Sequence, residues 1–442
     1  MTAGRDVTRP HGHPASWWML LISTLAILIT AIDRSILPTV LPGILDEFHL
    51  TNTEGGALIS LSFIGTFVGA ILFGAVGDIV GRGHRRAWTW VAAVAVTCVS
   101  AIATALTSTL GALRAWRVVM GIGTGGMEPV NVAMIAEWWP KEHRGFATGV
   151  HHTGFPFGQF LGPVVIGAAL AAGTWRTAFL WIPLIAVPIM IAQLMVGTRA
   201  NLERVNQWAL RRKLTPSVAL AEAVRPENPL RAIRQVLRER NIWCCLGMVF
   251  GLLWVETAVT SFLTTQLVQV AGFSLATAAV VSGASGITGW IGQIAWGTIS
   301  DRRGRKPALV IICVGWAVTV AAMPLIHDGL TAWTILILWG LFRNASFPVA
   351  YALIIDTAPK AASSGMGLTL ALALGLSGVI AAPIAGWMID HVGFTGNYLL
   401  LTVICLLSLI PLRFVRTPKR VDEPPPADPA PEISGRDEAA AS

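Results

Sequence analysis

Residues 74–82 read GAVGDIVGR, and residues 297–305 read GTISDRRGR. In both segments a glycine precedes an aspartate by four residues, and a Gly-Arg pair follows it. The two segments lie 223 residues apart, and Glu137-Trp-Trp-Pro-Lys141 recurs as Asp356-Thr-Ala-Pro-Lys360 at an offset of 219. Similarity at such a long offset indicates an internal repeat. The chain therefore consists of two related halves.

Outward from these motifs, each half contains six apolar windows of the length that crosses a bilayer, about 20 residues. They fall at 17–40, 55–77, 87–107, 111–137, 146–172 and 177–197, and again at 242–270, 276–299, 308–327, 332–355, 363–388 and 397–415. Only 13% of the residues are charged, against about 25% in soluble domains. This composition excludes a soluble enzyme or nucleic-acid-binding protein. We predict an all-α integral membrane protein whose twelve transmembrane helices form two pseudo-symmetric six-helix bundles.

The positive charge of the chain indicates its orientation. Of the 32 Lys and Arg residues, 26 lie on the side of the N-terminus and the central linker, and a single one, Arg176, lies in a loop of the other side. Cytoplasmic loops collect Lys and Arg, so both termini are predicted to be cytoplasmic, and the net charge of +8 is a topology signal rather than a nucleic-acid site. The predicted organisation is a cytoplasmic N-terminus (1–16), an N-terminal bundle (17–197), a cytoplasmic linker (198–240) with an amphipathic helix at 228–240, a C-terminal bundle (241–416) and a disordered cytoplasmic tail (417–442).

The repeated motif and its position resemble the major facilitator superfamily of transporters. The second copy is complete, whereas the first has Ile79 where a basic residue is usual. Two further matches are Arg117-x-x-x-Gly121-x-Gly123 and a glycine-proline motif, Gly149-(x8)-Gly158-(x3)-Gly162-Pro163. The resemblance covers about residues 17–415. It implies a transporter whose two halves rock around a central site.

The motif residues are expected to act mechanically. Small residues let membrane helices approach closely, so Gly74 and Gly297 are expected at helix contacts. An aspartate at a helix end can bind a neighbouring helix N-terminus and the following arginines, and these contacts must break when the cytoplasmic side opens. Arg117 is expected to tie its helix to a neighbour. The predicted gating residues are Gly74, Asp78, Arg82, Gly297, Asp301, Arg302, Arg305 and Arg117.

Five charged side chains are predicted deep in the membrane: Asp33, Arg34, Glu128, Glu256 and Arg343. A charge at the bilayer centre costs at least about 2.5–3.5 kcal/mol on insertion scales, so each is a functional hypothesis. The repeat offsets of 223 and 219 align Asp33 with Glu256 and Thr124 with Arg343. The alternative is that some of these charges form structural ion pairs.

A site that combines acids with arginines suits proton-coupled anion transport. An arginine offers a planar fork to a carboxylate, and burial raises the pKa of a carboxyl group while a nearby cation lowers it. The predicted substrate-binding residues are Arg34, Arg343, Asn131, Asn344 and Tyr351. The predicted proton-coupling residues are Asp33, Glu128, Glu256 and His152.

Two groups within the superfamily each resemble one part of this charge pattern. Ile32-Asp33-Arg34 resembles the anion:cation symporters, in which the acid of the fourth helix falls at the position of Thr124, one turn before Glu128. The run Gly-Thr-Gly-Gly-Met-Glu128-Pro-Val-Asn131 is similar to the aromatic acid:proton symporters. Both resemblances imply uptake of a small organic anion, such as an aromatic or other carboxylic acid, by proton symport.

The alternative function is a proton-driven efflux antiporter for a drug or metabolite, which the glycine-proline motif favours. No ATP site is expected, because no Gly-x-x-x-x-Gly-Lys-(Ser/Thr) run is present. We predict no enzyme activity and no cofactor, with the proton gradient as the energy source. The five cysteines lack C-x-x-C spacing, so no metal is predicted. The expected partners are the organic anion, protons and the bilayer of the cell inner membrane, with the monomer as the functional unit.

Overall fold

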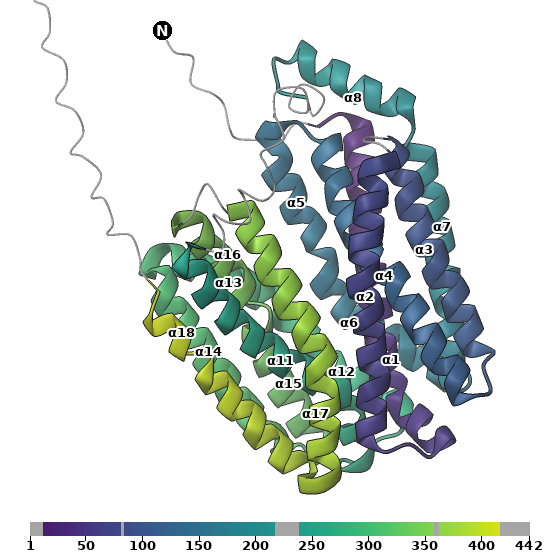
Figure 1. Ribbon diagram of the computed structural model, residues 1–442, viewed down its shortest axis with the longest axis vertical. Coiled ribbons are helices and arrows are strands. Elements are labelled where there is room, and N and C mark those ends of the chain that lie inside the picture. Colours follow the sequence, from purple (N-terminus) through teal and green to yellow (C-terminus); the bar gives the residue numbers. More distant parts are fainter. Residues whose placement is uncertain (1–11, 81–83, 217–237, 358–361, 416–442) are drawn as a thin grey trace, which may run out of the picture.

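The computed structural model of the protein describes residues 12–80, 84–216, 238–357 and 362–415, and every regular element in these ranges is a helix (Figure 1). Eleven helical stretches among them are long and apolar enough to cross a membrane. The last, Leu372–Arg413, covers 42 residues and contains Gly393, whose φ of 79° and ψ of 175° break the helix. The chain reverses there, so this stretch supplies two crossings (Figure 1). The twelve-helix prediction is confirmed.

The first six crossings form the N-half. Their helices are α1 (Pro14–Phe48), α2 (Asn52–Val80), α3 (His84–Ala105), α4 (Leu110–Trp138), α5 (Arg144–His152) with α6 (Gly154–Ala171), and α7 (Trp175–Val196). A short 3-10 helix, Lys141–His143, precedes α5, and α8 (Arg199–Arg211) follows α7. The fifth crossing is thus interrupted between α5 and α6.

The last six crossings form the C-half. Their helices are α11 (Arg240–Gln269), α12 (Leu275–Ser282) with α13 (Ala284–Arg303), α14 (Arg305–Ala322), α15 (Gly329–Arg343) with α16 (Ser346–Thr357), and α17 (Ala362–Leu407) with α18 (Ile410–Arg413). A 3-10 helix, Met323–Leu325, links α14 to α15. The interruption between α15 and α16 places Arg343 at the end of a helix.

The linker prediction is not tested by the described residues, which add a helix of their own. A helix was expected at 228–240, but residues 217–237 are outside the described part of the chain. The structure has α8 directly after the sixth crossing, where the side chain of Thr198 accepts a hydrogen bond from the backbone N–H of Asn201 as a helix cap. Val205 and Ala209 bury one face of α8 against the N-half. The predicted tails, 1–16 and 417–442, lie wholly or largely outside the described residues.

The two halves meet at one end of the molecule and diverge at the other, where α8 lies (Figure 1). We call these the far end and the linker end. One hydrophobic core joins both halves, from residues such as Leu41 and Phe179 to Leu253 and Tyr398, whereas a second core that includes Trp90 is confined to the N-half. The contacts that hold the halves together are thus concentrated at the far end.

Glycines at equivalent positions bring helices together within each half. A Cβ added at Gly69 of α2 would overlap the carbonyl of Ile122 in α4. Its repeat partner 223 residues later, Gly292, stands in the same relation to Leu341 of α15. Helices can approach this closely only where a side chain is absent. The repeat in the sequence is therefore also a repeat in packing.

The motif glycines do not have the packing role expected of them. A Cβ added at Gly74 or at Gly297 would meet nothing within 4 Å. The prediction that these two glycines sit at close helix contacts is therefore wrong for this arrangement of the halves. The close approach is made one to two turns away, by Gly69 and Gly292.

Candidate functional site

An ion pair joins α1 to α4 in the middle of the N-half. Arg34 Nη2 donates to Glu128 Oε2 at 3.1 Å, and both side chains are 25% exposed. The guanidinium carbon also lies 5.7 Å from the ring centre of Phe155 in α6. Arg34 thus has one charged partner and one aromatic neighbour, and it remains accessible to a further ligand.

A second ion pair joins α11 to α15 in the C-half. Arg343 Nε donates to Glu256 Oε1 at 2.9 Å, with side-chain exposures of 10% and 14%. Arg343 Nη1 also donates to Ser285 Oγ at 2.9 Å, and the guanidinium lies 4.8 Å from the ring centre of Trp339. This pair is more buried and more fully satisfied than the Arg34–Glu128 pair.

The two halves make the same contact at equivalent positions with different chemistry. In the N-half, Thr124 Oγ1 donates to Asp33 Oδ2. Their repeat counterparts are Arg343 and Glu256, which form the ion pair of the C-half. The alignment made from sequence therefore predicts a spatial contact correctly. The Arg34–Glu128 pair is an addition that the C-half does not repeat, because Thr257 and Phe347 occupy the aligned positions.

Residues of both halves surround the more exposed pair. Glu128 lies within electrostatic range of His152 of the N-half and of Tyr351 of the C-half. Asn344 Nδ2 donates to Gln159 Oε1 at 2.9 Å, a hydrogen bond between the halves. The site is therefore shared by the two halves, as alternating access around a central site requires.

Asn131 lies apart from these exposed groups. It is 1% exposed, and its Nδ2 donates to the carbonyl oxygen of Ser23 at 2.9 Å, so it ties α4 to α1. His151, beside His152, is fully buried, and the two rings meet edge to face at 5.2 Å. Substrate binding by Asn131 stays a prediction.

Arg117 is buried at the far-end side of Asp33. Its Nη2 donates to Thr104 Oγ1 of α3, and its guanidinium lies 4.5 Å from the ring centre of Phe179 in α7. It also acts electrostatically on Asp33. Arg117 thus ties α4 to two neighbouring helices, as expected, and extends the polar network from the site into the N-half.

The basic motif between α13 and α14 forms a local ion pair at the linker end. Arg305 Nη1 donates to Asp301 Oδ1 and, at 2.8 Å, to Ser300 Oγ. Gly304 adopts a φ of 95°, which favours glycine and makes the sharp turn between the two helices possible. The exposed Arg302 lies on the same turn. In the first copy, Arg82 and the side chain of Asp78 are outside the described residues.

Three residues outside the predicted binding and coupling sets contact the site. Phe155 and Gln159 lie one turn apart on α6, and Ser285 is buried in α13 beside Arg343. Only Gln159 carried a signal, as a polar residue in an apolar window. Phe155 and Ser285 are ordinary membrane residues whose role comes from their neighbours.

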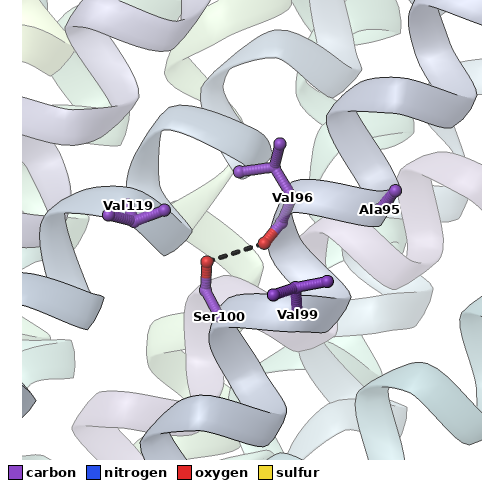
Figure 2. A pocket seen from close by; sticks show the side chains of 5 residues that line it. All are labelled: Ala95, Val96, Val99, Ser100 and Val119. Atoms are coloured by element: carbon purple, nitrogen blue, oxygen red, sulfur yellow. Dashed lines mark hydrogen bonds between the residues drawn. The ribbon is translucent and has the colours of Figure 1, made fainter.

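Two open grooves with mostly apolar linings lie away from these residues. One, of about 280 Å³, is lined by Ala95, Val96, Val99, Ser100 and Val119 of α3 and α4 (Figure 2). Its one hydroxyl, on Ser100, donates to the carbonyl oxygen of Val96 at 2.6 Å (Figure 2). Such an apolar groove offers nothing to a charged substrate, so the ion pairs mark the candidate site.

Comparisons with known proteins agree with this architecture. The family profile described as Major Facilitator Superfamily matches residues 23–372 and 335–436. A bacterial homologue of the human lysosomal transporter Spinster, solved in an inward-facing and unoccupied conformation, has a similar fold, with a TM-score of 0.68 and 16% identity. The match covers 92% of this chain and 98% of that one.

Two curated relatives match over nearly their whole length. A hexuronate transporter of Bacillus subtilis (strain 168) is 24% identical over 411 residues, which cover 90% of this chain and 94% of the relative. A benzoate transport protein of Acinetobacter baylyi (strain ATCC 33305 / BD413 / ADP1) is 21% identical over 442 residues, covering 94% and 92%.

Proposed function

Because the chain belongs to the major facilitator superfamily and is thus a multi-pass membrane transporter rather than an enzyme, we propose that it takes up a small organic anion, such as an aromatic or other carboxylic acid, together with one or more protons. The observation that carries this proposal is the partly exposed Arg34–Glu128 pair where residues of both halves meet. The names of the hexuronate and benzoate relatives support an organic acid as substrate.

The chemistry of the pair couples the anion to a proton. A substrate carboxylate that reaches Arg34 competes with Glu128 for the same guanidinium. Once Glu128 loses its cation, its carboxylate accepts a proton more readily. Substrate binding and protonation thereby favour each other. His152, close to Glu128, can pass the proton, and Asp33 and Glu256 are the other proton carriers of the proposal.

The second arginine gives the substrate an anchor in the C-half. Arg343 is held by Glu256, Ser285 and Trp339, so its guanidinium is fixed in direction. Asn344 and Tyr351 come after Arg343 in the chain and lie on the side of the C-half that faces the N-half. A substrate held between Arg34 and Arg343 would draw the halves together. This is how binding can promote the rocking motion.

The distribution of Lys and Arg supports cytoplasmic termini in a cell inner membrane. The linker end is then the cytoplasmic end. The halves diverge there (Figure 1) and share one core at the far end, so the structure represents an inward-facing state. In the proposal the monomer is the transporting unit.

Efflux by proton antiport is the second candidate, and it rests on the glycine-proline motif. In the structure Gly158 and Gly162 pack α6 against α1, at Leu28 and Ser35 respectively. This close packing of α6 on α1 is compatible with export as well as with import. The two arginines of the site disfavour a cationic drug as its substrate.

Transport in proteoliposomes tests the proposal. With an inward acid gradient, uptake of labelled benzoate or glucuronate should exceed uptake at equal pH, and Arg34→Ala should reduce it at least about tenfold, the effect of one charge-assisted contact. Arg114→Ala is the matched control, because Arg114 is an exposed arginine of α4. Uptake that is the same with and without the acid gradient would refute symport. Undiminished uptake by Arg34→Ala would refute the anion site.

A further inference from the structure

At the far end, a single aspartate of the C-half binds the first turn of a helix of the N-half. Asp390 Oδ1 accepts hydrogen bonds from the backbone N–H of Asn52 at 3.0 Å and from its Nδ2 at 2.8 Å. Asp390 Oδ2 accepts from the backbone N–H of Thr53 at 2.8 Å and from its Oγ1 at 2.6 Å. One carboxylate thus receives four hydrogen bonds from the opposite half.

The N-terminus of α2 leaves these amides for an outside partner. The first amides of a helix have no acceptor within the helix. Thr51 and Glu54 form a capping box, in which Glu54 Oε2 accepts from the backbone N–H of Thr51 and Thr51 Oγ1 accepts from that of Glu54. The amides of Asn52 and Thr53 point to Asp390 instead. The positive end of the helix dipole adds to the attraction for a carboxylate.

Close backbone packing surrounds this contact. A Cβ added at Gly386 would overlap the carbonyl of Asn52, and one added at Gly56 would overlap that of Ala382. One turn further from the end, Ser60 Oγ donates to the carbonyl oxygen of Val379 at 2.6 Å. Glycines let α2 and α17 meet, and Asp390 supplies the directional bonds.

We propose that Asp390 is a positioning residue for transport: its hydrogen bonds to Asn52 and Thr53 latch the far end shut and must break each time that end opens. The bonds join the two halves, so they stabilise only states in which the far end is closed. The rocking motion must separate α2 from α17 there. Asp390 therefore sets the equilibrium between the two orientations. This inference rests on the rocking of the halves and not on the substrate or on proton coupling.

The test measures how often the far end opens. Ser60→Cys introduces a thiol in the α2–α17 interface, where Ser60 is 7% exposed, and the five native cysteines are no more than 8% exposed. Full-length protein in nanodiscs is treated with a charged methanethiosulfonate, which reacts with the introduced thiol only when the interface opens. The chain without Ser60→Cys gives the background rate. No transport substrate is needed.

Adding Asp390→Ala should speed labelling by about tenfold or more, because charge-assisted bonds are lost from one state only. Asp390→Glu should return the rate toward that of the parent, since the carboxylate remains. Asp328→Asn is the matched control: Asp328 caps α15 at the far end in the same way, accepting from the N–H of Thr331 at 2.8 Å, but within one half. It should leave the rate unchanged.

Equal labelling rates for Asp390→Ala and the parent would overturn the latch, as would an equal increase from Asp328→Asn. Thr53→Val provides a second test should Asp390→Ala fail to fold. It removes one donor and leaves the carboxylate in place, and it should raise the rate by about two- to tenfold, the usual effect of losing a single hydrogen bond. An unchanged rate in Thr53→Val would then count against the proposal.

Discussion

Glu128 and Glu256 are both paired with arginines, yet the two acids differ in how readily the partner can leave. The Glu128 side chain is 25% exposed and accepts a hydrogen bond from Arg34, whereas the C-half arginine, Arg343, donates to Glu256 and also to Ser285. The N-half pair is thus suited to exchange its partner during transport. The C-half pair is suited to hold its shape.

Glu128→Gln tests the first role. The amide can still accept a hydrogen bond from Arg34, but it cannot take up a proton. We expect exchange of labelled for unlabelled anion across the membrane to continue, while accumulation driven by an acid gradient is lost. Asp33→Asn is the comparison, because Asp33 is 7% exposed and bonds to Thr124. Accumulation that survives in Glu128→Gln but not in Asp33→Asn would assign the proton to Asp33.

A double-mutant cycle tests the second role. Removing one partner of a buried ion pair costs about 3–5 kcal/mol, because the remaining charge has no partner. Arg343→Ala should therefore lower the midpoint of thermal unfolding clearly. Adding Glu256→Ala should restore part of the loss, since the orphaned charge is then gone. If both single variants unfold like the parent, the pair has no structural role.

At the scale of the elements, the closest helix contacts occur at Gly69 and Gly292 and not at the glycines of the repeated motif, Gly74 and Gly297. Gly69→Ala should destabilise the protein by about 1–3 kcal/mol, the usual cost of overpacking, because its Cβ would overlap the carbonyl of Ile122. Gly74→Ala, five residues further along α2, is the matched control and should be neutral or slightly stabilising, since its Cβ meets nothing within 4 Å. Thermal unfolding in detergent measures both. Equal losses would contradict the packing.

Much of the element level was predictable, because apolar length alone defines a crossing. The window 55–77 lies inside α2, and 276–299 lies inside the α12–α13 crossing. The helix breaks were not predicted, since each is a local change of one or two residues, such as the one after Arg343. The helix α8 was not predicted, because its many charged residues left no clear helical pattern of apolar residues in the sequence.

The site was predictable to the level of residue type and only partly to the level of partners. The cost of burying charge identified Asp33, Arg34 and Glu128 as candidates. The repeat offsets aligned Asp33 with Glu256 and Thr124 with Arg343, and the structure joins the two members of each half. That Arg34 binds Glu128 rather than its neighbour Asp33 could not be read from sequence. It depends on the rotation of α1 and α4 about their axes. Packing of the whole bundle sets that rotation.

In the described part of the chain, the contacts between the two halves are concentrated toward one end of the molecule. The shared core and the Asp390 contact lie at the far end, and Gln159–Asn344 crosses between the halves at the site. In the proposed mechanism, this arrangement is the one that faces the linker end. Return to the opposite orientation then requires the far-end contacts to be exchanged for new ones at the linker end, where the Asp301–Arg305 turn lies.

The contact between the first and fourth crossings has one further consequence, for how the protein diverged after the duplication of its halves. One copy joins Asp33 to Thr124, and the other joins Glu256 to Arg343. The position of the contact has been retained while its chemistry has changed. Selection could therefore alter the charge at this contact in one half without altering it in the other. Related proteins could thereby change what they transport through substitutions confined to one half.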